Sequence, residues 1–169
     1  KTVGVVFQDP DDQLFMPTVI EDVMFGPKNF GFNEEQIKEN SIKALEQVKM
    51  LEYIDKPPHH LSFGQKRKVA IASVLASEPE LLVLDEPSSN LDPASRRELI
   101  DILKNLEVSI ILVTHDLPMA LEICGRSIIL NNGKVTADTD TYKILKDEKI
   151  MSDNRLELPF GFALHHLED

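Results

Sequence analysis

Residues 61–87 constrain the fold of this chain more than any other segment. A Ser-x-Gly-Gln turn, Ser62–Gln65, opens an apolar helix, and an aliphatic run, Leu81–Leu84, then leads into Asp85 and Glu86. The start of a helix can hold an anion, because its backbone N–H groups are free and the helix dipole is positive there. Open α/β sheets place their ligands at the C-terminal ends of their strands. The two carboxylates are therefore suited to a metal ion and a water molecule.

Short aliphatic runs separated by helical stretches predict an α/β fold for the second half of the chain. Runs of this length are typical of parallel strands covered on both faces. Helices are expected near 93–106 and 117–124, between the runs. A further buried strand is predicted at Val3–Phe7, and a turn at 131–133 should return the chain as another strand. The three runs are Leu81–Leu84, Ser109–Val113 and Ser127–Leu130.

The chain between the first strand and residue 79 is mostly helical in pattern. Thr18 with Glu21, and Asn33 with Gln36, have the spacing of capping boxes that begin helices. A buried helix is expected at roughly 64–77, and another near 140–149. We predict a helical subdomain inserted into an α/β core. The expected ranges are 1–17 and 79–140 for the core, 18–78 for the helical subdomain, and 141–169 for a C-terminal helix and tail.

Composition restricts the classes of function. The net charge of -11 argues against a general nucleic-acid binder, because neutralising phosphates requires clustered Lys and Arg. It does not exclude a nucleotide, whose charge backbone amides and Mg²⁺ can balance. The single cysteine, Cys124, rules out an internal disulfide and fits a reducing compartment. No apolar run approaches the roughly 18 residues of a transmembrane helix, so we expect a cytosolic chain whose membrane role requires a membrane partner.

The residues of the 61–87 segment leave two interpretations open when they are taken alone. Asp85 and Glu86 fit a Mg²⁺ ligand beside a residue that orients and deprotonates water, but also a strand followed by an acidic turn. Ser62 and the residues after it fit an anion site, but also a simple helix cap followed by a solvated basic run, Lys66–Lys68.

Five motifs in order favour the functional interpretation, because together they resemble the ATP-binding cassette (ABC) ATPases. The family usually has Gly where this chain has Phe63, but Ser62, Gly64 and Gln65 keep the hydroxyl and amide donors. Signature, Walker B and D-loop together form a highly specific combination. The motifs are Gln8 (Q-loop), Ser62–Gln65 (signature), Asp85-Glu86 (Walker B), Ser88–Asp92 (D-loop) and His115 (switch histidine).

The resemblance implies a role for each site residue, with ATP and Mg²⁺ as ligands. Glu86 would be the general base, positioned by His115, and Gln8 would reach Mg²⁺ and the attacking water. Asp85 would hold Mg²⁺. Four further residues would act across a dimer interface, on or near the nucleotide of the partner subunit: Ser62, Gly64, Gln65 and Asp92.

Sequence around the first strand narrows the resemblance to the cobalt-type and energy-coupling-factor importers, which take up Co²⁺, Ni²⁺ or vitamins. The resemblance implies a P-loop NTPase (RecA-like) core with an inserted helical ABC subdomain. It also implies a homo- or heterodimer of ATPase subunits on the cytoplasmic face of the membrane, with a permease docked near the Q-loop at Asp11, Asp12, Phe15 and Met16. The similar segments are Phe7–Phe15, Pro17–Val19, Glu21–Val23, Phe25–Pro27 and, more weakly, Leu156–Pro159.

The phosphate-cradling Gly-rich loop (Walker A) does not occur in these 169 residues. Gly26–Gly31 has the G-x-x-x-x-G spacing, but it continues with Phe32 and follows Gln8, so we interpret it as a decoy. We therefore expect a partial nucleotide-binding domain that is inactive by itself. A non-transport ABC ATPase and a non-catalytic interaction fragment are the alternatives. The 54 residues from Gln8 to Ser62 leave no room for the long coiled-coil insertion of the chromosome-maintenance type.

Overall fold

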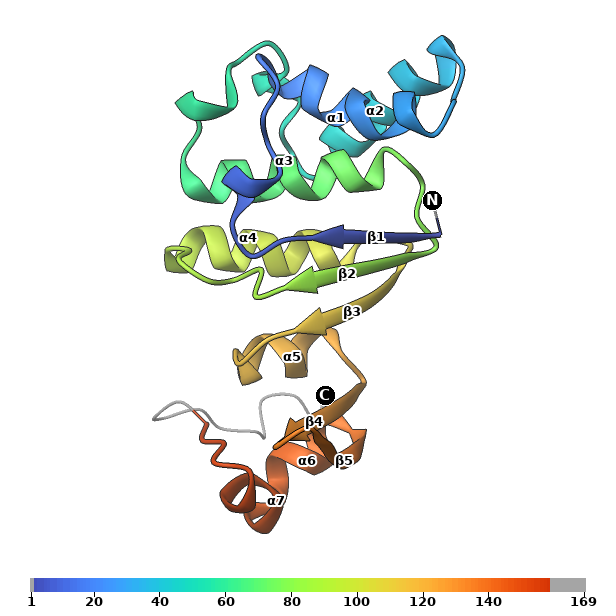
Figure 1. The fold of residues 1–169 in the computed structure, drawn as a ribbon. Coiled ribbons are helices and arrows are strands. Elements are labelled where there is room, and N and C mark those ends of the chain that lie inside the picture. Colours follow the sequence, from blue (N-terminus) through green and yellow to red (C-terminus); the bar gives the residue numbers. More distant parts are fainter. Residues whose placement is uncertain (1, 159–169) are drawn as a thin grey trace. The chain divides into compact units, whose positions relative to one another are not determined.

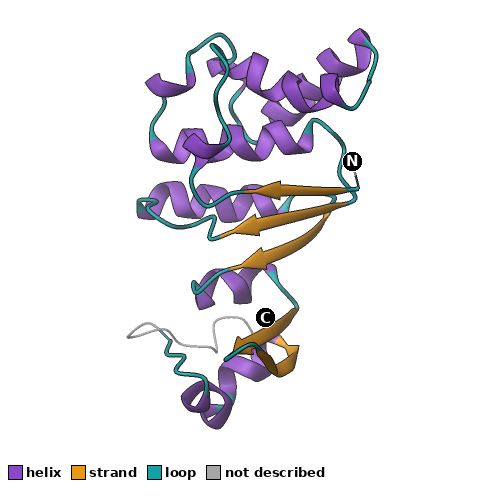
Figure 2. Ribbon diagram, in the orientation of Figure 1, coloured by secondary structure: helices purple, strands orange, loops and turns teal. Residues whose placement is uncertain are grey.

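The computed structural model describes residues 2–158 of the chain (Figure 1). The chain forms two compact units, one that ends at Thr114 and one that begins at His115. Only helical elements occur between residues 10 and 75, whereas strands and helices alternate from residue 81 to 131; Figure 2 colours the two kinds of element. Residues 159–169, which include Pro159, His165, His166 and most of the expected C-terminal tail, lie outside the described residues.

The first unit contains a three-stranded parallel sheet of order β1-β2-β3. Its strands are in register, so that Val5 lies beside Val83 and Val83 beside Ile111. The prediction of parallel strands is confirmed here. The strands are β1 (Val3–Val6), β2 (Leu81–Asp85) and β3 (Ser109–Val113).

The two faces of this sheet differ in burial. Val6, Leu82 and Leu84 on one face are fully buried. On the same face α3 approaches β1 so closely that a side chain at Gly4 would collide with Val74. The expectation that the strands are covered on both faces is wrong for the described residues, because the helices of this unit pack on one face only. The apolar side chains of the other face keep 44–51% of their exposure: Val3, Val5, Ile111 and Val113.

A group of helices lies beyond β1 on the buried side of the sheet (Figure 1). Its central helix, α3 (Phe63–Leu75), contacts both α1 (Val19–Asn29) and α2 (Glu34–Gln47). Its largely buried character is confirmed by Val69, Ala70, Ile71 and Ala72, none of which is exposed. Three short 3-10 helices, η1 (Pro10–Asp12), η2 (Leu51–Tyr53) and η3 (Pro58–His60), and one longer helix, α4 (Pro93–Lys104), complete the described elements of the unit.

One of the two expected capping boxes forms and the other does not. The side chains of Asn33 and Gln36 bond each other's backbone N–H groups at the start of α2, as predicted. Thr18 precedes α1 but makes no cap, because its hydroxyl donates to Glu21 instead. The first two N–H groups of α1 bond backbone carbonyls at 54 and 56, so the start of this helix is satisfied by tertiary contacts rather than by its own sequence.

The second unit contains a two-stranded antiparallel hairpin of β4 (Arg126–Asn131) and β5 (Lys134–Asp140). The predicted turn is confirmed, with positive φ at Asn132 (50°) and Gly133 (73°), as a tight hairpin of this type requires. The expectation that the third aliphatic run, Ser127–Leu130, is also a parallel strand is wrong. The short turn after it pairs β4 with β5 in a separate sheet.

Three short helices accompany the hairpin: α5 (Leu117–Ile123), α6 (Thr141–Lys146) and α7 (Glu148–Asp153). The single helix expected near 140–149 is therefore wrong. Asp147 interrupts it in an extended conformation and caps α7, accepting hydrogen bonds from the N–H groups of Lys149 and Ile150. A small core of Ile144, Leu145 and Met151 holds this unit together, with Leu117, Leu121 and Ile129 packed against it.

Candidate functional site

The two candidate carboxylates stand at the C-terminal end of the middle strand. Asp85 is the last residue of β2 and is exposed, and Glu86 follows it partly buried. Glu86 is tied to the neighbouring strand, since its N–H donates to the Val113 carbonyl at 2.8 Å and its carboxylate accepts from the Thr114 hydroxyl at 3.4 Å. The sequence prediction that both carboxylates lie at the strand end is confirmed by this geometry.

Glu86 adopts an unusual backbone conformation, with φ at 44°. A left-handed residue that is not glycine costs roughly 1–2 kcal/mol, and such strain gathers at functional sites because the surrounding structure must enforce it. Here the enforcing contact is the hydrogen bond from Glu86 to β3, supported by the turn in which the Ser89 N–H donates to the Glu86 carbonyl at 3.1 Å. The bond to β3 thus holds the Glu86 carboxylate in place at the end of β2.

The signature turn begins α3 through a reciprocal cap. The Ser62 hydroxyl oxygen accepts from the Gln65 N–H at 3.3 Å, and the Gln65 side-chain oxygen accepts from the Ser62 N–H at 2.9 Å. Both residues act as acceptors in this cap. The Ser62 hydroxyl hydrogen and the Gln65 amide NH₂ therefore remain as donors for an anion, and the cap and anion-site interpretations are compatible.

Gly64 lies directly against the start of α4, the helix that follows the D-loop. A Cβ atom at Gly64 would stand 2.9 Å from the Ser95 Oγ and 3.0 Å from its Cβ, so no larger residue fits without movement. Ser95 in turn bonds Asp92, which caps α4 and also accepts from the Ala94 N–H. These bonds, that from the Ser95 hydroxyl above all, lower the pKa of the Asp92 carboxyl. Two motifs distant in sequence thus meet within one unit.

The basic residues that follow the signature are not a uniformly solvated face. Lys66 pairs with Asp11 at 2.6 Å and Lys68 with Glu98 at 3.0 Å, so acidic groups from other segments balance two of the charges near the helix start. Arg67 is completely buried. Burial lowers the pKa of its guanidinium, partly opposed by the charge of Asp9. The sequence alone indicated none of this for Arg67.

Gln8 is exposed two residues beyond β1, at the same end of the sheet as the carboxylates. The backbone of Phe7, the residue just before it, is bonded on both sides: the Phe7 N–H donates to the Gln13 side-chain oxygen at 3.3 Å, and the Phe7 carbonyl accepts from Arg67 Nη1 at 2.9 Å. Sequence reasoning missed both partners. The one available signal was the acidic and polar run after Gln8 opposite the basic run after Gln65.

His115 is the first residue of the second unit and follows β3 through Thr114. Its carbonyl accepts from the Leu117 N–H at 3.1 Å as α5 begins. Its expected action on Glu86 stays a prediction. Gly26–Gly31, by contrast, belongs to the C-terminal half of α1 and its cap, where Gly31 has φ 75°, so its interpretation as a decoy is confirmed.

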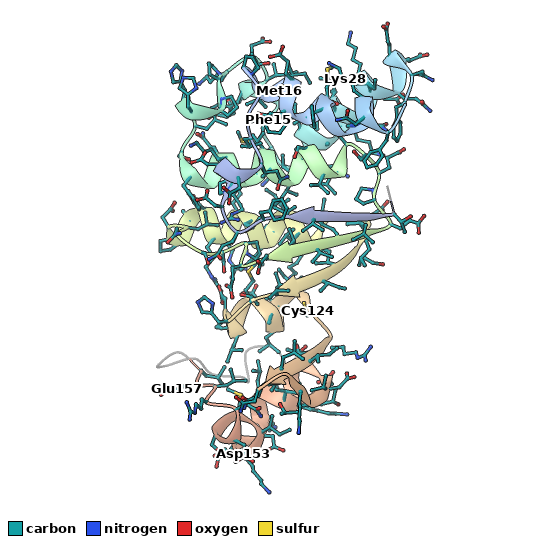
Figure 3. The ribbon with its side chains drawn as sticks, in the orientation of Figure 1. Phe15, Met16, Lys28, Cys124, Asp153 and Glu157 are labelled. Carbon is teal, nitrogen blue, oxygen red and sulfur yellow. The ribbon has the colours of Figure 1, made fainter. Side chains whose placement is uncertain are left out.

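A buried carboxylate holds the turn at Phe15 and Met16, two residues that are labelled in Figure 3. One oxygen of Asp22 accepts from both backbone N–H groups of this turn at 3.0 Å, and burial raises the pKa of the carboxyl. Phe15 stays 63% exposed and stacks edge-on against Phe25, with ring centroids 4.9 Å apart. The turn is therefore an exposed apolar feature with a rigid base.

Residues 2–158 contain neither a ready-made cluster of metal ligands nor a membrane-spanning helix. No group of three or more His, Cys, Asp or Glu side chains in this range is arranged to hold a metal ion. Mg²⁺ on a nucleotide needs only one or two protein carboxylates, because phosphates and water supply its other ligands. Asp85, an exposed carboxylate at a strand end, fits that requirement. No helix in the described range is long and apolar enough to cross a membrane.

Comparison with known proteins gives consistent matches. The family model described as "AAA domain, putative AbiEii toxin, Type IV TA system" matches residues 19–122. A Streptomyces avermitilis protein named "Putative ABC transporter ATP-binding protein" is 62% identical over 162 residues, covering 96% of this chain and 62% of that protein. The energy-coupling factor transporter ATP-binding protein EcfA of Methanosphaera stadtmanae is 44% identical over 161 residues, with 94% and 58% covered.

A solved structure extends the likeness to the fold. CbiO1 from Clostridium perfringens, described as part of the ABC transporter complex CbiONQ, superposes with a TM-score of 0.79 at 38% identity, covering 94% of this chain and 64% of that one. The chain thus spans less than two thirds of each of these three proteins. With its parallel sheet and helical insertion, it has the P-loop NTPase fold of an ABC ATPase. The chain belongs to the family of ABC transporter ATP-binding proteins and is similar to its cobalt-type and energy-coupling-factor members.

Proposed function

We propose that these residues are part of an ATP-binding and ATP-hydrolysing subunit of an ABC importer, which powers uptake of cobalt, nickel or a vitamin through a membrane partner. The observation that carries the proposal is the strand-end pair Asp85 and Glu86, in which β3 holds Glu86 in a strained conformation. The names of the relatives support the transport role, because they include energy-coupling factor and CbiONQ components.

Each residue at the sheet edge has one task in this proposal. Glu86 orients the attacking water and takes its proton, which a carboxylate tied to a neighbouring strand can do without moving. Asp85 and Gln8 hold the Mg²⁺ that accompanies ATP, and that ion supplies neutralisation of phosphate charge when it is bound. His115 contacts the γ-phosphate and positions Glu86. The sheet edge thus provides the chemistry for the nucleotide held on its own chain.

The signature and D-loop residues act on a second nucleotide in a homo- or heterodimer of ATPase subunits. Ser62, Gly64 and Gln65 present a hydroxyl, a backbone N–H and an amide to the γ-phosphate held by the partner, and the helix dipole of α3 favours that charge. Asp92 lies close to the same site. Its contact with Ser95, which packs on Gly64, supports joint placement of the two motifs.

The membrane permease docks beside the segment that follows Gln8, on the cytoplasmic face of the membrane. The rigid turn of Phe15 and Met16, with Asp11 and Asp12 next to it, supplies an exposed surface of mixed apolar and acidic character.

The division of the chain into subdomains stays part of this proposal. It assigns 1–17 and 79–140 to the core, 18–78 to the helical subdomain, and 141–169 to the C-terminal helix and tail.

The working ATPase is a longer polypeptide that also carries a phosphate loop. Support comes from the relatives, of which this chain spans about 58–64% in the three cases compared, and from the absence of a G-x-x-x-x-G-K-[ST] segment in the 169 residues. A polypeptide of residues 1–169 alone is expected to show no saturable MgATP binding at sub-millimolar concentration in a calorimetric titration. Saturable binding with a micromolar dissociation constant, which corresponds to a binding free energy on the order of -8 kcal/mol, would contradict this point.

Steady-state hydrolysis by the full-length protein and its Glu86→Gln variant tests the proposed function. Removing the base should lower turnover on the order of 10²–10⁴-fold while MgATP binding is preserved. Glu98→Gln is a matched control, since it removes a carboxylate of the same unit that pairs with Lys68 instead. Substantial turnover by Glu86→Gln would overturn the role of Glu86, and a wild-type protein without ATPase activity would overturn the proposal itself.

A further inference from the structure

The backbone of Phe7, the residue that precedes Gln8, is held from both sides by one side chain that is bonded to α3 and one that belongs to it. Gln13 accepts from the Phe7 N–H and uses its own NH₂ group to bond the Ala70 carbonyl at 2.8 Å and the Ser73 hydroxyl at 2.9 Å. Arg67, itself a residue of α3, donates to the Phe7 carbonyl at 2.9 Å. We call Phe7, Gln13 and Arg67 with these bonds the Phe7 clamp.

Packing alone does not account for an arginine at position 67. Its side chain is completely buried, and among residues 2–158 its Nε and Nη2 atoms have no hydrogen-bond partner. A buried guanidinium with incomplete bonding is costly, and an apolar side chain of similar volume is often neutral or more stable at such a place. The bond to the Phe7 carbonyl is therefore a direct contact that an apolar residue would fail to provide, besides the attraction of the Asp9 charge.

The clamp also touches the signature turn. The guanidinium carbon of Arg67 lies 5.2 Å from the centre of the Phe63 ring, within the range of a cation–π contact, and Phe63 stands between Ser62 and Gly64. Arg67 thereby joins two segments about 60 positions apart, the one leading to Gln8 and the one presenting Ser62 and Gln65. A single buried side chain reports on the placement of both.

We propose that Arg67 and Gln13 are positioning residues, which fix the Phe7 backbone against α3 and so set where the exposed Gln8 side chain reaches relative to the signature turn. The inference rests on the proposed function, since it concerns residues of that site. Rotation about the Phe7 backbone would redirect the residue that follows it. Loss of the clamp should therefore act on catalysis through Gln8, while the contacts of the protein with the phosphates of the nucleotide stay in place.

The test compares kcat and MgATP affinity of the full-length protein with those of Arg67→Met, which keeps the volume but loses the bond to Phe7. We expect kcat to fall about tenfold or more, as for other small displacements in an active site, and the dissociation constant to change no more than about twofold. Arg67→Lys, which can still donate one bond, should recover part of the loss. Lys68→Met removes a charge from the same helix without touching the clamp, and its kcat should stay within about twofold of wild type.

A double-mutant cycle with Gln8→Ala separates positioning from a merely structural effect. If Arg67 acts through Gln8, the double variant should be no slower than Gln8→Ala alone, because nothing remains to be misplaced. Multiplicative losses in kcat would overturn the inference. If Arg67→Met does not fold, Gln13→Met enters the same cycle, with the same two outcomes. Lack of hydrolysis in the wild type contradicts the proposed function, whereas an active wild type with multiplicative losses contradicts this inference alone.

Discussion

The two halves of the candidate site are constructed in different ways. The carboxylate half at Asp85 and Glu86 is held by the backbone of the sheet, through the bond from the Glu86 N–H to β3. The signature half at the start of α3 is held by side chains: the reciprocal cap of Ser62 and Gln65, and the contact of Gly64 with Ser95. A side-chain substitution in the half that is held by backbone bonds, the backbone-built half, should lower activity but change the free energy of unfolding little. A substitution in the half that is held by side chains should lower both.

The largest stability effect is expected for Gly64→Ala on the signature side. The added Cβ would meet Ser95 at about 3 Å, so α3 or α4 must shift, and overpacking of this kind typically costs ~1–3 kcal/mol. Urea unfolding of the full-length protein measures the change. Gly125→Ala is the control, because no atom lies within 4 Å of the position its Cβ would take. Equal effects at the two glycines would break the comparison.

Ser62→Ala should give the next largest loss, because it removes the side-chain acceptor of the α3 cap. Substitutions of this kind typically cost ~1 kcal/mol, within a range of about 0.5–2. Ser62→Thr keeps the hydroxyl and should lie much closer to wild type in the same unfolding measurement. A full loss with Thr as well would mean that the cap bond is not what stabilises the start of the helix.

Glu86 allows the backbone-built half to be tested without regard to its carboxylate. Glu86→Ala and Glu86→Gly both remove that group, so they differ mainly in the left-handed strain at φ 44°. We expect the glycine variant to be more stable than the alanine variant by ~1 kcal/mol. Thermal unfolding of the two proteins side by side decides this. Equal stability would indicate that the strain at this position is relieved or absent.

Asp22, which supports the Phe15 turn, should give a small effect that depends on pH. Burial raises its folded-state pKa above the value of 3.8 taken as unperturbed, so the folded protein binds this proton more tightly than the unfolded chain. Its contribution to stability is fully present below pH 3.8 and is lost as pH rises through the raised pKa. The unfolding free energy is measured as a function of pH for the wild type and for Asp22→Asn. The wild-type value minus the variant value should therefore fall with rising pH. A difference that is flat or rises would contradict the sign.

Features that depend on nearby residues could be predicted from the sequence. The cap of Asn33 with Gln36 and the turn at Asn132 and Gly133 formed as expected, because each needs only groups a few residues apart. The parallel core was predictable for a similar reason, since buried strands are short aliphatic runs. The order of the motifs along the chain then led to the family without any spatial information.

Features whose partners lie far along the chain could not be predicted in this way. The first N–H groups of α1 bond carbonyls at 54 and 56 rather than a Thr18 cap, and the buried Arg67 has its acceptor on Phe7, 60 positions away. Backbone carbonyls carry no mark in the sequence, so a basic residue that bonds one resembles a basic residue in water. The pairing of β4 with β5 rather than β3 shows the same limit for strands.

Complementation between subunits tests the central claim most directly, namely that the two halves of one chain serve different nucleotides. Glu86→Gln and Ser62→Arg variants of the full-length protein are measured for ATP hydrolysis separately and after mixing in equal amounts. Each variant alone should be nearly inactive. The mixture should recover about a quarter of the wild-type rate, because half of the two-fold dimers are mixed and each mixed dimer retains one complete site. A mixture no more active than either variant would contradict the account.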